Sequence, residues 1–368
     1  MGSRTFSAVS LVCLAVVNIG IGRAQTRSAL PAASAFSTAA QLQQVAYIKA
    51  SNPHANDHFG NGGTLEGHGL SLSGDASTLA VGAPYESSAA KGINGNQNDT
   101  SLFSSGAVYV FTRVNNAWTQ QAYIKASNPG QSARFGQVVS LSQDGSTLAV
   151  SAYYEASAAK GIDGDQNDKS IPQAGAVYVF TRRGTTWSQQ AYIKASNTGE
   201  KGTATVPDEG DQFGFSISLS ADGNTLAAGA ISEDSGAKGI NGDQNDNSQQ
   251  SSGAVYVFTR TGGKWSQQAY VKASNTDAMD LFGYAVGLSA DGNTMAVAAY
   301  DEDSSAREIN GVMDKGRRGS GAIYVFTRTG ANWAQTAYLK ASNAENGDSL
   351  GSLLAKHLGW PHFLDLFR

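Results

Sequence analysis

The stretch Gly106-Ala107-Val108-Tyr109-Val110-Phe111-Thr112-Arg113 returns three more times, beginning at Gly175, Gly253 and Gly321. The intervals are 69, 78 and 68 residues, and the last copy differs only by Ile in place of the first Val. A tryptophan follows each copy, and then the string Ala-Tyr-(aliphatic)-Lys-Ala-Ser-Asn, which also stands alone at 46–52. Self-similarity at a nearly fixed period is the signature of a repeat architecture.

Each repeat contains four segments that read as strands, which in the third repeat are 213–220, 225–230, 253–259 and 265–273. The first two are joined by Asp222-Gly223, a dipeptide favoured in tight hairpins because both residue types tolerate positive φ. The Val-Tyr-Val-Phe segment is apolar on both faces, as expected when a sheet is sandwiched between two neighbours. The sequence therefore predicts an all-β propeller of four-stranded antiparallel blades.

The chain resembles a known repeat family. Phe-Gly stands at 135–136, 213–214 and 282–283, each followed by a strand, and the first repeat carries Leu-Ala-Val-Gly-Ala-Pro at 79–84. These motifs, spread over 43–345, resemble the FG-GAP repeat, the blade unit of integrin α-chain heads and of many bacterial surface proteins. The resemblance implies a propeller with a recognition role, although the other repeats lack the full Gly-Ala-Pro.

The repeats number fewer than the seven blades usual in that family. Four full copies span about 59–128, 135–197, 213–275 and 282–343. The lone string at 46–51 is predicted to be the outer strand of a partial blade. After Leu350-Gly351 the pattern is lost, so 346–368 is interpreted as an aberrant tail, with the reading frame truncated or shifted near Ser352. We therefore predict an incomplete ring whose exposed strands permit edge-to-edge self-association.

The N-terminus has the pattern of a secretory signal. Residues 1–24 combine Arg4, an apolar run and the small residues around Arg23, and an Ala/Ser-rich linker follows at 25–42. A membrane anchor is the alternative, but the run is short and interrupted. We expect no membrane span after cleavage, and a secreted, extracellular or cell-surface protein, with the periplasm also compatible. Cys13 is the only cysteine, so the mature chain has no disulfide, thiol nucleophile or thiolate zinc site.

The loop between the second and third strands repeats a pattern of oxygen-bearing side chains. Asn, Asp and Gln alternate around a Gly, and calcium takes six to eight such oxygen ligands. Upstream Glu86, Glu155 and Glu233 could complete the shell. The alternative is that these are ordinary turn residues, whose side chains bond their own backbone. The candidate calcium ligands are Asn94, Asn96, Asn98, Asp99, Asp163, Asp165, Asn167, Asp168, Asn241, Asp243, Asn245 and Asp246.

These features favour a binding role over catalysis. The formal charge of −4 without a basic cluster argues against nucleic acid. Familiar catalytic motifs are absent from the sequence, so we predict a non-enzymatic module that recognises an extracellular protein or glycan through its loops, assisted by Ca2+. A structural surface repeat without a ligand is the alternative, and a propeller hydrolase is the least favoured. The repeated tryptophans are interpreted as blade packing rather than a sugar platform, and the lysines of the strings as solvated.

Overall fold

The computed structural model describes residues 44, 46–60, 69–199 and 210–351. Apart from Gln44, all of these belong to the compact unit Ala46–Arg368. The predicted signal peptide, the linker at 25–42, the residues after 351 and the proposed frame change near Ser352 lie outside the described residues. Among the residues described, no helix is long and apolar enough to cross a bilayer.

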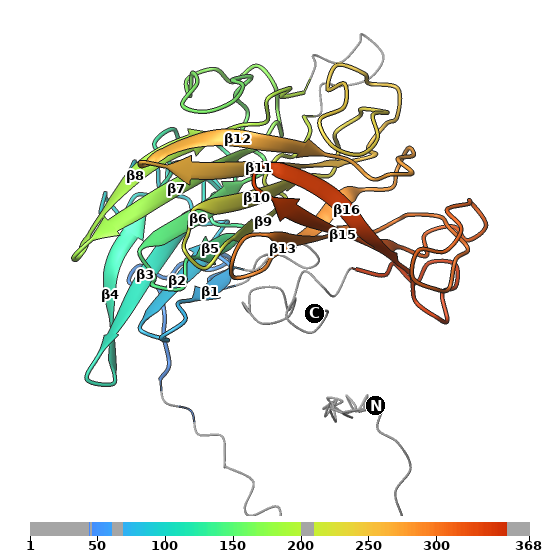
Figure 1. The fold of residues 1–368 in the computed structure, drawn as a ribbon. Coiled ribbons are helices and arrows are strands. Elements are labelled where there is room, and N and C mark those ends of the chain that lie inside the picture. The colour runs from blue at the N-terminus through green and yellow to red at the C-terminus, as the bar shows by residue number, and fades with distance from the viewer. Residues whose placement is uncertain (1–43, 45, 61–68, 200–209, 352–368) are drawn as a thin grey trace, which may run out of the picture. The chain divides into compact units, whose positions relative to one another are not determined.

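In the described part of the chain, sixteen strands form four antiparallel sheets, each of which takes four strands in chain order (Figure 1). The first sheet contains β1 (Leu70–Leu72), β2 (Thr78–Ala83), β3 (Ala107–Val114) and β4 (Ala117–Ile124). The second contains β5 (Val139–Leu141), β6 (Thr147–Ala152), β7 (Ala176–Arg183) and β8 (Thr186–Ile193). The third contains β9 (Ser216–Leu219), β10 (Thr225–Ala230), β11 (Ala254–Thr261) and β12 (Lys264–Val271). The fourth contains β13 (Phe282–Leu288), β14 (Thr294–Ala299), β15 (Ala322–Thr329) and β16 (Asn332–Leu339).

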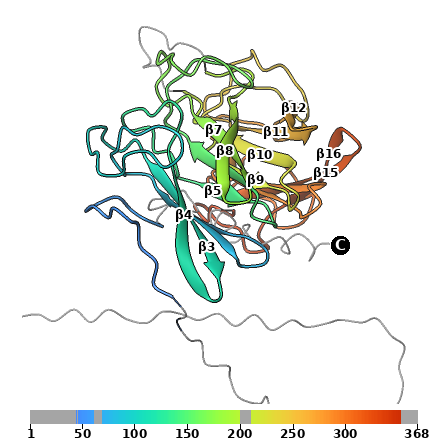
Figure 2. The same cartoon turned by 90° about the vertical axis from the view of Figure 1, so that its left-hand side faces the viewer.

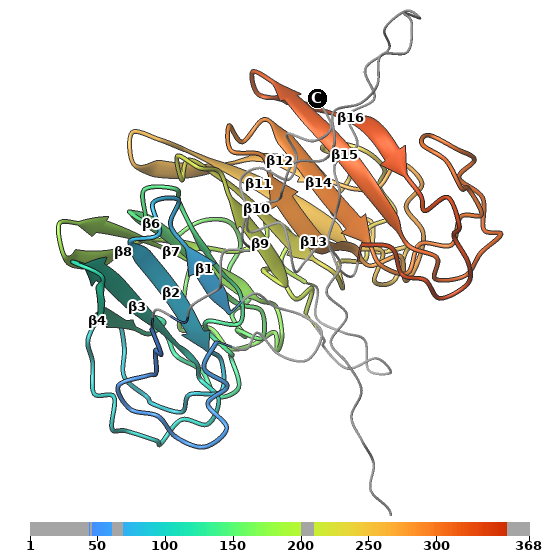
Figure 3. The same cartoon turned by 90° about the horizontal axis from the view of Figure 1, so that it is seen from below.

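The sheets stack face to face because the third strand of each is apolar on both sides. Successive strand residues point to opposite faces. In β11, Tyr256 and Phe258 pack with residues of the second sheet, whereas Val255 and Val257 pack with residues of the fourth. The first strands of successive sheets contact one another, and the fourth strands lie on the outside (Figures 2 and 3). The four sheets are therefore blades of a β-propeller, and the predicted architecture is confirmed.

The Phe-Gly motif joins each blade to the next. Gly106 forms a parallel bridge to Phe135, and Gly321 forms the corresponding bridge to Leu350. Gly253 has a φ of +79°, and a Cβ atom there would lie 2.1 Å from the carbonyl oxygen of Phe282. Glycine is required at this position both by the left-handed backbone and by the close approach of the next blade.

In the first three blades, a β-bulge turns one glutamine of the outer hairpin toward the next blade. In the first blade the register shifts between Val110 and Phe111, so Gln121 has no strand partner. Its Oε1 accepts a hydrogen bond of 2.9 Å from the Trp187 indole of the second blade. Gln190 and Gln268 make the same contact with Trp265 and Trp333. The interpretation of the tryptophans as blade packing is therefore confirmed for these three, and bulges commonly re-aim a side chain in this way.

Two local expectations differ from the structure. The lone string at 46–50 forms no strand, and none of the strands in the described residues pairs with it. Its end is nevertheless anchored, since Asn52 accepts a hydrogen bond of 2.6 Å from the hydroxyl of buried Tyr109. In the Asp222-Gly223 turn only the glycine has positive φ, at +66°. The Asp222 carboxylate instead accepts a hydrogen bond of 2.9 Å from the Asn224 amide, which closes the turn.

Candidate ligand-binding loops

A buried ion pair lies beneath the loop between the second and third strands of every blade. A glutamate near the start of this loop contacts, through its carboxylate, the lysine that follows the fourth strand. Both side chains are at most 1% exposed in each pair. The pairs and their Nζ–Oε2 distances are Lys125–Glu86 (2.7 Å), Lys194–Glu155 (2.9 Å), Lys272–Glu233 (2.7 Å) and Lys340–Glu302 (2.7 Å).

Each glutamate also accepts neutral hydrogen bonds. In the third blade, Glu233 accepts from the Tyr270 hydroxyl at 2.7 Å and from the Ser235 amide at 3.2 Å. Asn197, which ends the string of the second blade, donates to it at 3.0 Å. Burial lowers the pKa of Lys272, while the nearby carboxylate of Glu233 opposes this shift. The lysine and these neutral donors together offset the free-energy cost of burying the Glu233 carboxylate.

Two expectations about charged residues are therefore wrong. The lysines of the four strings within the blades are buried, and only Lys49 of the lone string is exposed. Glu86, Glu155 and Glu233 do not complete a shell around the loop oxygens, because each holds a lysine instead. The repeated Lys and Glu thus form ion pairs that join the start of each loop to the end of the fourth strand of its blade.

Above this base, the candidate calcium ligands bond largely to the loop backbone. Asn94 Oδ1 accepts from the Tyr123 amide at 2.9 Å, and Asn96 Oδ1 accepts from the Asn98 amide at 3.0 Å. The two carboxylate oxygens of Asp99 accept from Ala89 and Ser101. The second loop repeats this arrangement through Asp163, Asp165 and Asp168, and the third through Asn241, Asp243 and Asp246.

The fit of these oxygens to a cation is partial. No group of three or more His, Cys, Asp or Glu residues in the described ranges is arranged to hold a metal ion. In each loop, the side chains at the positions of Asp165 and Asn167 are exposed. Their oxygens therefore keep lone pairs that face solvent. A carboxylate offers about four lone-pair sites, so a single backbone bond does not exhaust it.

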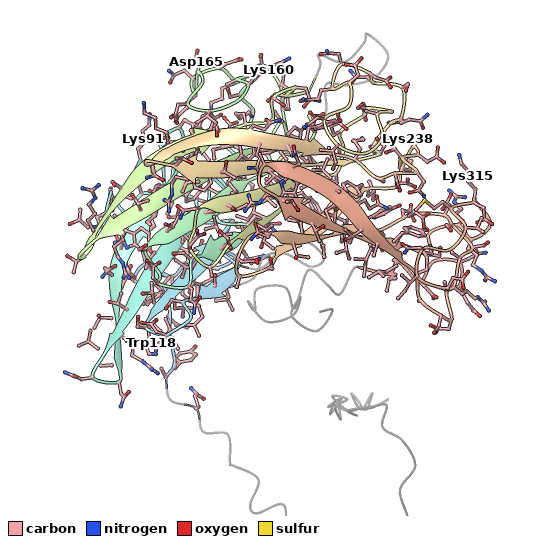
Figure 4. The ribbon with its side chains drawn as sticks, viewed as in Figure 1. Lys91, Trp118, Lys160, Asp165, Lys238 and Lys315 are labelled. Carbon is pink, nitrogen blue, oxygen red and sulfur yellow. The ribbon has the colours of Figure 1, made fainter. Side chains whose placement is uncertain are left out.

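The same loops carry a lysine at one fixed position. Lys91, Lys160 and Lys238 are exposed, and Figure 4 shows Lys160 beside Asp165 on the loop of the second blade. Each loop also contacts the end of the preceding blade, since the Asn128 side chain donates to the Gln166 carbonyl at 2.9 Å. In the fourth loop, where the oxygen pattern is lost, Asn310 still accepts a hydrogen bond of 2.9 Å from the Tyr338 amide.

A second feature at this end of the blades departs from the repeat. Arg134, just before the Phe-Gly of the second blade, lies between two tyrosines that follow β2 and β6. Its guanidinium carbon is 4.9 Å from the ring centroid of Tyr85 and 4.5 Å from that of Tyr154. We call these three residues the Tyr–Arg–Tyr stack. The stack was not predicted from the sequence. The signal that could have indicated it is an Arg at a position whose residue type varies between otherwise similar repeats.

Comparisons with known proteins agree with this architecture. The FG-GAP repeat family model matches residues 118–180 and 265–326, each match running from an outer strand into the third strand of the next blade. The chain is therefore built of four-stranded propeller blades. It carries FG-GAP repeats at these two sites.

Solved structures with a similar course of the chain are distant in sequence. A periplasmic gluconolactonase from Pseudomonas aeruginosa is 16% identical, with 77% of this chain and 87% of that chain covered and a TM-score of 0.28. A putative 6-phosphogluconolactonase from Bacteroides uniformis is 10% identical, with coverages of 74% and 71% and a TM-score of 0.36. No match was found among curated proteins.

Proposed function

We propose that this protein is a secreted or cell-surface recognition module that binds an extracellular protein or glycan through the loops at one end of its blades. The observation that carries the proposal is the repetition of one loop geometry in three successive blades. Each copy presents an exposed lysine and exposed amide groups, and the second and third copies also present exposed carboxylates. Binding residues are commonly placed on loops that a rigid scaffold positions.

The rigidity of the loops supports this role. The buried ion pairs beneath them and the side-chain bonds to their own backbone limit the conformations that the loops can adopt. A ligand that meets preformed loops loses less free energy to their ordering, which strengthens binding for a given set of contacts. Three equal loops also suit a repetitive ligand, because several weak contacts add through effective concentration.

We further propose that Ca2+ assists by bridging the exposed side-chain oxygens at the loop positions of Asp165 and Asn167 and their counterparts. Its contribution would be to neutralise carboxylates and order the loops, with no part in a reaction. A rise in the melting temperature at millimolar Ca2+, absent with Mg2+, would support it. An unchanged melting temperature would contradict the calcium proposal but would not contradict recognition by the loops.

Glycan and protein arrays probed with the secreted chain, with and without Ca2+, test the main proposal. We expect ligands that are lost when Lys91, Lys160 and Lys238 are changed to Ala. The matched control changes Arg183 and Lys264, exposed cations in the hairpins at the opposite end of the sheets. Absence of any specific ligand, or equal loss in the control, would contradict recognition by the loops and favour the structural alternative.

A further inference from the structure

We propose that the Tyr–Arg–Tyr stack at the junction of the first and second blades binds the carboxylate of an acidic sugar. The site takes Tyr85 and Tyr154 from the start of two of the lysine-bearing loops but uses none of their lysines, so it can fail while the proposed function holds, and the reverse. Four observations carry it, namely the held guanidinium, the lack of a carboxylate partner among the described residues, its departure from the repeat and the aromatic residues beside it.

The guanidinium is held in a fixed orientation. Its carbon lies over the rings of Tyr85 and Tyr154, and Arg134 Nη1 donates a hydrogen bond of 3.0 Å to the Tyr153 hydroxyl. Aromatic contacts engage the faces of a guanidinium and leave the donors on its edge available. Because Arg134 and both tyrosines are half-buried, the remaining donors lie where solvent or a ligand can reach them.

Within the described ranges, no carboxylate lies within ion-pair distance of the Arg134 guanidinium. The arginines of the outer hairpins also bond to neutral groups, since Arg182, Arg260 and Arg328 hydrogen-bond to a glutamine of the preceding blade. A half-buried, oriented guanidinium with no carboxylate partner among the described residues is suited to pairing with a planar carboxylate through two parallel hydrogen bonds.

The stack occurs only where the repeat is broken. The residue before Phe-Gly has the same left-handed backbone in every blade, with φ values of 55°, 54°, 57° and 54°. Its identity nevertheless changes, as His58, Arg134, Gln212 and Leu281. The position of Tyr85 and Tyr154 is likewise Ser232 and Asp301 in the third and fourth blades. The backbone therefore does not require Arg here, and packing alone does not explain it.

A row of aromatic side chains continues from the stack toward the fourth blade. The ring centroids are 5.6 Å apart for Tyr153 and Phe215, 5.2 Å for Phe215 and Tyr284, and 4.5 Å for Tyr284 and Tyr300. Tyr284 and Tyr300 are half-buried, so part of the row faces outward. One fixed cation next to partly exposed rings and phenol hydroxyls matches a uronic acid, which combines a carboxylate, hydroxyls and apolar ring faces.

Isothermal titration with oligogalacturonate tests the proposal on the secreted chain. The matched ligand is its methyl ester, which keeps the rings and removes the charge. The decisive variant is Arg134→Gln, because Gln212 occupies this position in the third blade and shows that the backbone accepts it. We expect binding of the acid at least tenfold tighter than of the ester, and at least tenfold weaker in Arg134→Gln with an unchanged melting temperature.

Two further variants separate this site from a general effect of positive charge. Lys264→Gln removes one positive charge elsewhere and should bind as the wild type does, and the variant lacking the three loop lysines should also retain uronate binding. Equal affinity for the methyl ester, or equal losses in Arg134→Gln and Lys264→Gln, would overturn the proposal. So would binding of poly-glutamate or a sulfated dextran in place of oligogalacturonate, which would assign the cation to an acidic peptide or to a sulfated sugar.

Discussion

The buried ion pair of the third blade offers the sharpest test of the structural argument. Replacing Lys272 by Met keeps most of the side-chain volume and leaves the Glu233 carboxylate buried without its cation. Tyr270, Asn197 and Ser235 would still donate hydrogen bonds to it. Removing one partner of a buried pair costs about 3–5 kcal/mol, because the other charge remains uncompensated. For a protein of this size we expect the melting temperature to fall by about 5–10 °C.

The double variant Lys272→Met, Glu233→Gln removes the stranded charge. Since an apolar and a neutral polar group replace the pair, we expect most of the loss to be recovered, to within about 1–2 kcal/mol of the wild type. Lys264→Met is the control, because Lys264 begins β12, the strand that Lys272 follows, but is exposed. Such changes usually stay within about 0.5 kcal/mol. Thermal and urea unfolding followed by tryptophan fluorescence at pH 7 measure all three. A single variant as stable as the control, or a double variant no better than the single, would refute the reasoning.

Three other parts of the fold can be tested through stability. Burial, with a further contribution from Glu302, raises the pKa of Asp280 to about 8. The folded protein therefore holds a proton that the unfolded chain has released, so the free energy of unfolding should fall as the pH rises toward 8, and Asp280→Asn should flatten this slope in melting curves from pH 5 to 9. Gly253→Ala should lower the free energy of unfolding by more than about 3 kcal/mol, because the new Cβ would clash with the next blade. Gly262→Ala, at a glycine with positive φ but nothing within 4 Å, should cost about 1 kcal/mol. Equal losses in urea titrations would show that the contact does not matter. Gln190→Leu should cost about 1–3 kcal/mol by leaving the buried Trp265 indole without its acceptor, and a melting temperature equal to that of the wild type would contradict it.

Much of the fold follows from the repeat in the sequence. The period, the Asp-Gly turns and strands apolar on both faces together determine four-stranded sheets that stack on one another. The lone string at 46–52 shows the limit of this reasoning, because a strand needs a neighbour to bond to and the pattern alone does not supply one. Its asparagine, in contrast, has the same kind of partner as its counterparts in the blades.

The environment of the charged residues was much harder to predict. A lysine in a segment that alternates with polar residues has the pattern of a solvated position. Lys125 and its counterparts are nevertheless buried, because each forms an ion pair with a glutamate almost forty residues earlier in the chain. That pairing depends on how the loop folds back over the sheet. The Tyr–Arg–Tyr stack joins residues of two blades, so only the packed structure brings them together.

The asparagine at the end of each string has a consequence for how the protein unfolds. Asn128, Asn197 and Asn275 each donate to the glutamate of the following blade, so no such blade completes its own buried polar set. Unfolding of one repeat should therefore leave the buried carboxylate of its successor with one donor fewer, which couples the stabilities of neighbouring repeats. Excised single repeats should fail to fold, and a destabilising change in one repeat should lower the stability of the repeats next to it.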